Sequence, residues 1–199
     1  MWTDLAAHAA QHVGLAASAL ALAAAAGLPL GSFAAQYEPI RNVALALAGI
    51  GRTLPSLAVL MFLLPVLGVG SSPAIVALAL LAIPPIVISV DLGIRGVPPG
   101  VLDAAAGLGM TARQRFARVI VPLALPVSFA GVRTAATETI ASATLATFIG
   151  GGGLGDDIVR GLQTDDVALL FAGAATVALL ALVVEALLGG VARSIEART

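Results

Sequence analysis

Two histidines near the start of the chain have a spacing that metal sites on helices often use. His8 and His12 are four residues apart, so a helix would place both imidazoles on one face. Zinc sites of this kind also need a third protein ligand, and neither the Glu of an HExxH motif nor another ligand stands nearby. We therefore predict no metal site in this chain.

A glycine-rich run later in the chain has the letters of a nucleotide-binding fingerprint. Gly150 to Gly155 satisfies GxGxxG, but that pattern indicates a dinucleotide site only between a strand and a helix. Here the run follows a long apolar stretch. We interpret it as a flexible, tightly packed external turn near an outer gate rather than as a nucleotide site.

The composition indicates a membrane protein without an ATPase site of its own. Of the 199 residues, 59% are hydrophobic and 11% are charged, and the mean hydropathy is +1.05; soluble domains carry about 25% charged residues. There is no cysteine, and all ten basic residues are arginine. A P-loop needs a lysine to reach the phosphates. We expect no enzyme activity and no cofactor in this chain, and no nucleic-acid partner.

Five apolar stretches are long enough to cross a bilayer, which needs roughly 20 helical residues. Every backbone polar group in lipid must be satisfied within its own segment, so these stretches are predicted to be helices. The predicted fold is an all-α, polytopic bundle formed by one domain over residues 1–199. The predicted spans are Val13–Leu30, Val43–Leu67, Ala74–Val90, Leu123–Ile149 and Val167–Leu188.

The distribution of arginine predicts the orientation. Cytoplasmic loops collect Arg, and an outside N-terminus leaves only Arg160 in an outer loop. The C-terminus is then cytoplasmic, and the two histidines form a polar pair at the outer leaflet. The first stretch has no basic n-region, so we expect it to remain in the mature chain. The cytoplasmic arginines in this arrangement are Arg41, Arg95, Arg113, Arg115, Arg118, Arg193 and Arg198.

Ionisable residues inside the predicted spans are candidates for a transport pathway, because such residues are costly in lipid. They are Arg52, Arg133 and Glu138. The alternative is structural pairing, for example of Arg52 with Glu138, or extension of Arg133 to the cytoplasmic surface. Asp91 and Arg95 have the acidic-first spacing of a local helical salt bridge.

The longest polar interruption, Leu92 to Pro122, is predicted to form two short helices. Pro98 and Pro99 suit a helix start, and Gly107-Leu108-Gly109 ends that helix. Thr111 and Gln114 form a capping box for a second, basic helix. A helix–glycine–helix elbow below the membrane suits a groove on a partner protein. An amphipathic loop on the membrane surface is the alternative.

This segment resembles the EAA loop of permeases from binding-protein-dependent ABC importers. Asp103-Ala104-Ala105 is followed by three residues, a glycine, nine residues and Val119-Ile120-Val121-Pro122. Asp replaces Glu at the first position, and Val replaces Ile and Leu near the end. In the family this loop is the coupling helix that enters a cleft of the ATPase. The coupling residues that the resemblance implies are Asp103, Ala104, Ala105, Gly109, Met110 and Pro122.

Further segments resemble the osmoprotectant branch, which imports glycine betaine, choline and carnitine. They include Leu54 to Ala58, Gly93 to Val97 and Ala130 to Ala135. The resemblance implies two ATP-binding subunits that hold ATP and Mg²⁺, a second permease chain and an external solute-binding protein in a bacterial inner membrane. The scarcity of aromatic residues within the spans also places solute selection in the binding protein.

Three other functions remain open on the sequence, of which a passive channel or membrane scaffold ranks last. A methionine-like amino-acid importer belongs to the same superfamily and shares the EAA and glycine-rich segments. An ion-coupled secondary transporter would use Glu138 or Asp91 as its ion site. Such transporters are often built from internal repeats, and none is evident here.

Overall fold

A computed structural model describes residues 2–197 and is helical along most of this length. Four helical stretches are long and apolar enough to span a membrane: Asp4–Gln36, Ser71–Arg95, Ala112–Ile149 and Val167–Glu196. A bent pair of helices brings the number to as many as five. The predicted all-α membrane bundle is therefore confirmed. Met1, Arg198 and Thr199 lie outside the described residues.

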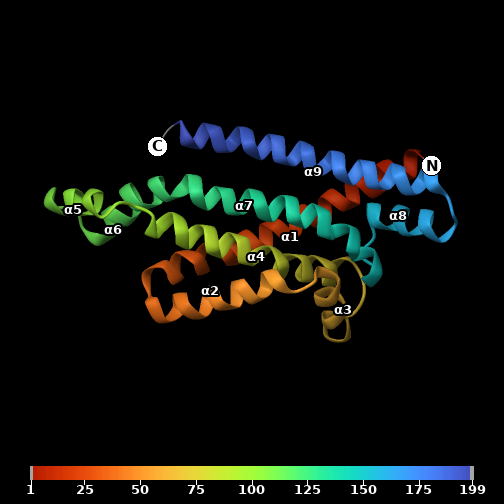
Figure 1. Cartoon of the computed structure of the whole chain (residues 1–199), viewed down its shortest axis with the longest axis horizontal. Coiled ribbons are helices and arrows are strands. Elements are labelled where there is room, and N and C mark those ends of the chain that lie inside the picture. Colours follow the sequence, from red (N-terminus) through yellow and green to blue (C-terminus); the bar gives the residue numbers. More distant parts are fainter. Residues whose placement is uncertain (1, 198–199) are drawn as a thin grey trace.

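The long helices run along one common direction (Figure 1). α4 is central and packs against α1, α2 and α7, while α9 packs on α7 and α8. The short helices α5 and α6 extend from one end of the bundle, and α3 and α8 lie at the other end with the N-terminus (Figure 1). The helices are α1 (Trp2–Gln36), α2 (Glu38–Thr53), α3 (Ser56–Leu67), α4 (Ser71–Arg95), α5 (Pro99–Gly107), α6 (Ala112–Arg115), α7 (Val121–Ala143), α8 (Leu154–Gln163) and α9 (Val167–Glu196).

The predicted second span is not one helix. Leu54 and Pro55 separate α2 from α3, and the chain bends by 105° between the two helices. Leu54 is extended (φ −75°, ψ 131°), because the ring of a following proline disfavours the helical conformation. The continuous span predicted over Val43–Leu67 is wrong in this respect: the segment is a broken helix pair.

Small side chains allow the central helices to approach closely. The core contains alanines from three helices, among them Ala19 and Ala23 of α1, Ala82 of α4 and Ala135 of α7, all buried. A Cβ on Gly93 of α4 would lie 2.7 Å from the backbone oxygen of Ala124 in α7, which is closer than carbon and oxygen atoms can pack. This agrees with the packing role expected of small residues in membrane helices.

Candidate functional site: a terminal elbow and an intramembrane polar cavity

The first helix of the elbow ends in a glycine-dependent turn. The N–H of Met110 donates to the carbonyl of Ala105 (3.2 Å), and the N–H of Gly109 donates to the carbonyl of Ala106 (2.9 Å). This pair of bonds is a Schellman motif, in which the residue after the helix cap adopts a left-handed conformation. Gly109 does so, with φ +76°. The glycine predicted to break the helix thus also satisfies its last carbonyl groups.

The second part of the elbow begins at the predicted capping box. The N–H of Gln114 donates to Oγ1 of Thr111 (3.3 Å), and the N–H of Thr111 donates to Oε1 of Gln114 (2.8 Å). The expectation of a separate short helix was wrong, since the chain stays helical from Ala112 through α7. A π-helical stretch, η1 (Phe116–Ile120), joins the two parts. Its i→i+5 bond precedes Pro122, whose missing N–H would interrupt a regular helix.

The predicted coupling residues lie on one projecting unit. Asp103, Ala104 and Gly109 are exposed, Met110 is half-buried, and Ala105 packs inside the elbow. Pro122 is exposed at the start of α7, farther along the same helical stretch. The structure therefore gathers the motif into one feature at the end of the bundle (Figure 1), with Pro122 at its base.

Leu108 is a residue of this site that the sequence reasoning did not single out. It lies between the two glycines at the turn, and 80% of its surface is exposed. An exposed leucine on a projecting turn is typical of contact surfaces when it adds to other apolar groups. Its position between Gly107 and Gly109, at the end of the predicted helix, was the signal available in the sequence.

Two ion pairs connect α2 to the end of α4 that leads into the elbow. Nε of Arg41 donates to both carboxylate oxygens of Asp91 (2.9 and 3.2 Å), and Arg95 lies 2.9 Å from Glu38. The predicted local salt bridge between Asp91 and Arg95 is therefore wrong. Asp91 is 1% exposed and faces α2, so its charge is satisfied by a residue fifty positions earlier in the chain.

Arg52 and Glu138 line one small polar cavity of about 220 Å³. Arg52 lies in the last turn of α2, Glu138 lies in α7, and Ser56 and Ser142 are among the other lining residues. Both charged residues are exposed on the single chain. Within residues 2–197, no ion pair joins them, so the pairing considered from the sequence is wrong. The structure nevertheless brings them to the same cavity.

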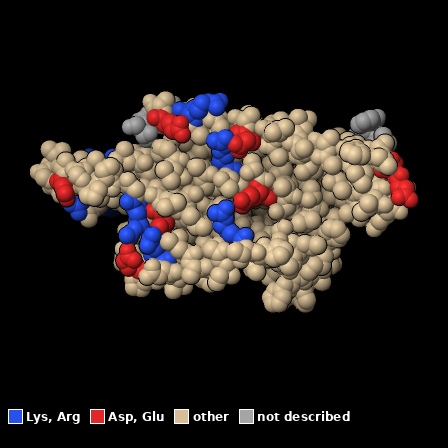
Figure 2. Space-filling model, in the orientation of Figure 1, with Lys and Arg blue, Asp and Glu red and all other residues tan. Residues whose placement is uncertain are grey.

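These two charges indicate that this face does not contact lipid. An Arg at the centre of a membrane helix costs at least about 2.5 to 3.5 kcal/mol. Most of the visible surface is uncharged, and its charged side chains gather in a few mixed groups (Figure 2). A face that exposes Arg52 and Glu138 is therefore expected to be covered by protein or to line a water-filled pathway.

Arg133 lies at a different place from the other two candidates. It forms a hydrogen-bonded ion pair with Glu185 of α9, and Thr134 and Thr137 lie beside the pair. Of the interpretations left open for Arg133, structural pairing is the one that the structure supports. It is not brought together with Glu138.

The histidines tie α1 to α7 and α8. His12 is 0% exposed, and its Nε2 donates to the carbonyl of Ile140 (2.9 Å). His8 Nδ1 lies 2.8 Å from Asp157 of α8. His12 therefore lies inside the bundle, and the placement of the two histidines at the level of the outer leaflet stays a prediction. The described residues contain no group of three His, Cys, Asp or Glu arranged for a metal ion.

The glycine loop is closely packed, as expected. The side chain of Gln11 donates to the carbonyl of Gly151 and accepts from the N–H of Gly153, both at 3.2 Å. Gly150, Gly152 and Gly153 have positive φ, which L-residues with side chains rarely adopt. No strand precedes this loop among the described residues, so it lacks the setting of a nucleotide fingerprint.

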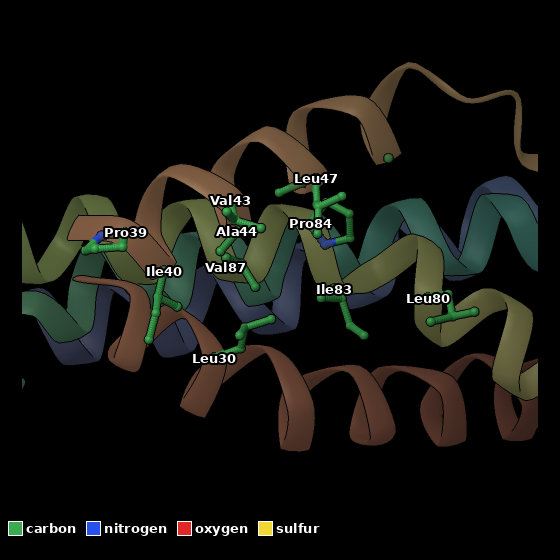
Figure 3. A pocket seen from close by; sticks show the side chains of 12 residues that line it. Leu30, Pro39, Ile40, Val43, Ala44, Leu47, Leu80, Ile83, Pro84 and Val87 are labelled. Carbon is green, nitrogen blue, oxygen red and sulfur yellow. The ribbon is translucent and has the colours of Figure 1, made fainter. Parts of the chain in front are cut away.

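A larger cavity of about 560 Å³ lies between α1, α2 and α4. Its lining includes Leu30, Val43, Leu47 and Val87, whose side chains appear in Figure 3. All of its lining residues are apolar or glycine. This cavity therefore has no side chain that could orient a charged solute, in contrast to the one between Arg52 and Glu138.

The described residues form a bundle of helices long and apolar enough to span a membrane, with an elbow that projects from one end. Residues 27–198 match the family described as "Binding-protein-dependent transport system inner membrane component", and the chain belongs to this family. It is thus a permease component of a transport system of the ABC type.

Named relatives support the same assignment over most of the chain. The carnitine transport permease protein OpuCB of Listeria monocytogenes is 41% identical, with 90% of this chain and 82% of the relative covered. The choline transport system permease protein OpuBB of Bacillus subtilis is also 41% identical, over 88% and 81%.

Solved structures confirm the fold. A chain of the MetNI methionine ABC transporter, in an inward-facing conformation, matches with a TM-score of 0.82 at 19% identity, covering 96% of this chain and 95% of that one. At this identity the likeness concerns the fold and not the solute.

Proposed function

We propose that this chain is the permease subunit of an ATP-driven importer of small quaternary ammonium solutes, such as glycine betaine, choline and carnitine. The relatives at 34–41% identity carry carnitine, choline, glycine betaine or osmoprotectant in their names. The methionine transporter is similar at only 19% identity. The osmoprotectant assignment is therefore better supported than the amino-acid alternative.

The observation that carries the coupling mechanism is the exposed elbow at one end of an apolar bundle. In our proposal Leu108 and Met110 enter a cleft of an ATPase subunit, and Asp103 lies at its polar rim. Buried apolar anchors surrounded by polar contacts dominate the energetics of most protein interfaces. ATP and Mg²⁺ bind to the partner, because this chain has no lysine for a P-loop. Two such ATPases would serve a pair of permeases.

The two ion pairs between α2 and α4 give the elbow a means to move the bundle. α4 leads directly into α5, and Asp91 and Arg95 hold its end to Arg41 and Glu38 of α2. A displacement of the elbow by the ATPase would then shift both helices together. This movement would switch the pathway between outward-facing and inward-facing states.

A second permease chain would cover the face that exposes Arg52 and Glu138. Solute would arrive from an external binding protein at the end that holds the N-terminus and α8, and the elbow would face the cytoplasm. The opposite positions of α8 and the elbow (Figure 1) agree with this orientation, and the arginine distribution supports it.

The test is ATP-dependent uptake by the complete complex in proteoliposomes. We expect labelled glycine betaine to enter when ATP and the binding protein are present. An ATPase partner with its P-loop lysine substituted should give no uptake, which serves as the control. Uptake that survives ATP removal but collapses with the ion gradient would instead indicate a secondary transporter.

A further inference from the structure

The cavity between α2, α3, α4 and α7 combines two opposite charges with hydroxyl groups. Arg52 and Glu138 lie on opposite helices of its lining, with serine hydroxyls nearby. Arg133 has Glu185 as an ion-pair partner, and Asp91 has Arg41. Arg52 and Glu138 differ from these paired residues. Within the spans that the structure describes, they expose a cation and an anion to one cavity and form no ion pair with each other.

We propose that this cavity is a transit site for a zwitterionic solute, with its carboxylate bound by Arg52 and its quaternary ammonium beside Glu138. The proposal rests on the proposed function and adds a location and an orientation for the solute. A guanidinium group presents paired donors that match a carboxylate. A quaternary ammonium has no N–H to donate, so a carboxylate attracts it by charge alone.

The size of the cavity agrees with a small solute. Its volume of about 220 Å³ is below the roughly 300–1,000 Å³ of pockets for drug-sized ligands. No aromatic residue lines it, so it lacks the cation–π cage that gives tight binding of such cations. The site is also open on the single chain. Weak binding follows from these features, and weak binding allows the solute to leave after the bundle opens inward.

The two charged residues should act differently on two related solutes. Glycine betaine carries a carboxylate and a quaternary ammonium, whereas choline carries only the cation. Arg52→Gln removes the partner of the carboxylate, so it should affect glycine betaine alone. Glu138→Gln removes the partner of the cation, so it should affect both. Substitution of a residue that only stabilises the fold would change the binding of both solutes together.

The experiment measures solute binding to the permease–ATPase complex in lipid nanodiscs without the external binding protein, by saturation-transfer NMR on the trimethylammonium protons. For Arg52→Gln we expect about tenfold weaker glycine betaine binding, equivalent to about 1.4 kcal/mol, and unchanged choline binding. Arg52→Lys retains the charge and should restore most of the affinity. Arg193→Gln, on the exposed end of α9, is the matched control and should change neither solute.

The outcomes separate this proposal from the proposed function. If Arg52→Gln weakens the binding of both solutes equally, or of neither, the proposal of a transit site is wrong. ATP-dependent uptake by the unsubstituted complex would still be retained in that case. Absence of binding to the unsubstituted complex also overturns that proposal. If the unsubstituted complex, reconstituted in proteoliposomes with its binding protein, shows no ATP-dependent uptake of either solute, the proposed function itself fails.

Discussion

Alanine at Gly109 should weaken coupling to the ATPase through backbone conformation alone. The residue has φ +76°, and a Cβ added there would meet nothing within 4 Å. Steric crowding therefore contributes nothing, and the cost is that of a left-handed conformation for a residue with a Cβ, about 1–2 kcal/mol. The elbow projects from the bundle, so little packing elsewhere compensates. This cost corresponds to a change of up to about 5- to 30-fold in the equilibrium between the folded elbow and other conformations.

Neighbouring substitutions provide a graded series with a matched control. Gly109→Asn should stay close to the unsubstituted protein, because asparagine tolerates the left-handed region. Gly109→Val should weaken ATPase binding more than Gly109→Ala does, because branching at Cβ crowds the backbone further. Gly107→Ala lies two residues away at the end of α5, also with nothing within 4 Å, and without positive φ. Alanine favours a helix by up to about 1 kcal/mol over glycine, so this control should bind as well or better.

The assay is titration of the permease in nanodiscs with purified ATPase subunit, followed by solute-stimulated ATP hydrolysis of the assembled complex. The apparent Kd should rise by up to about 5- to 30-fold for Gly109→Ala, with stimulated hydrolysis falling in the same order across the series. Equal Kd values for Gly109→Ala and Gly107→Ala would refute the reasoning, because only the first substitution acts on a residue with positive φ.

Three further predictions concern stability and orientation. Asp91→Asn leaves Arg41, whose side chain is 26% exposed, without its counter-charge, so thermal unfolding in detergent should begin at a lower temperature than in the unsubstituted protein. Gly131→Leu should prevent assembly of a folded bundle, because its Cβ would overlap the side chain of Ser89; yield and gel-filtration profile report this. Single cysteines at Ala112 and Thr164, both exposed, should react with membrane-impermeant maleimide from the cytoplasmic and external sides respectively.

Each of these has its own control. The exchanged pair Arg41→Asp with Asp91→Arg should recover part of the lost stability, and no recovery would argue against a direct pair. Gly49→Leu, which has open space around its Cβ, should fold normally; if it fails as badly as the change at Gly131, close packing is not the cause. The chain has no natural cysteine, so labelling background is low, and a reversed pattern would invert the orientation.

Features that depend on neighbours along the chain could be predicted from the sequence. Long apolar stretches form helices in lipid because each helix satisfies its own backbone. The capping box at Thr111 and the helix end before Gly109 involve residues within one turn of each other, so side-chain chemistry and glycine conformation determine them locally. The break at Leu54 was also readable from the following proline, although its angle of 105° was not.

Only the tertiary structure decided which distant residues meet. Asp91 pairs with Arg41 rather than with Arg95, although the four-residue spacing favoured the local partner, because helix packing turns its carboxylate toward α2. The burial of His12 against Ile140 and the shared cavity of Arg52 and Glu138 have the same origin. The sequence pattern of a helix predicts which face of that helix a residue occupies. It does not predict which other helix will contact that face. That partner depends on how all the helices pack, and their packing is set by the close contacts of small residues in the assembled bundle.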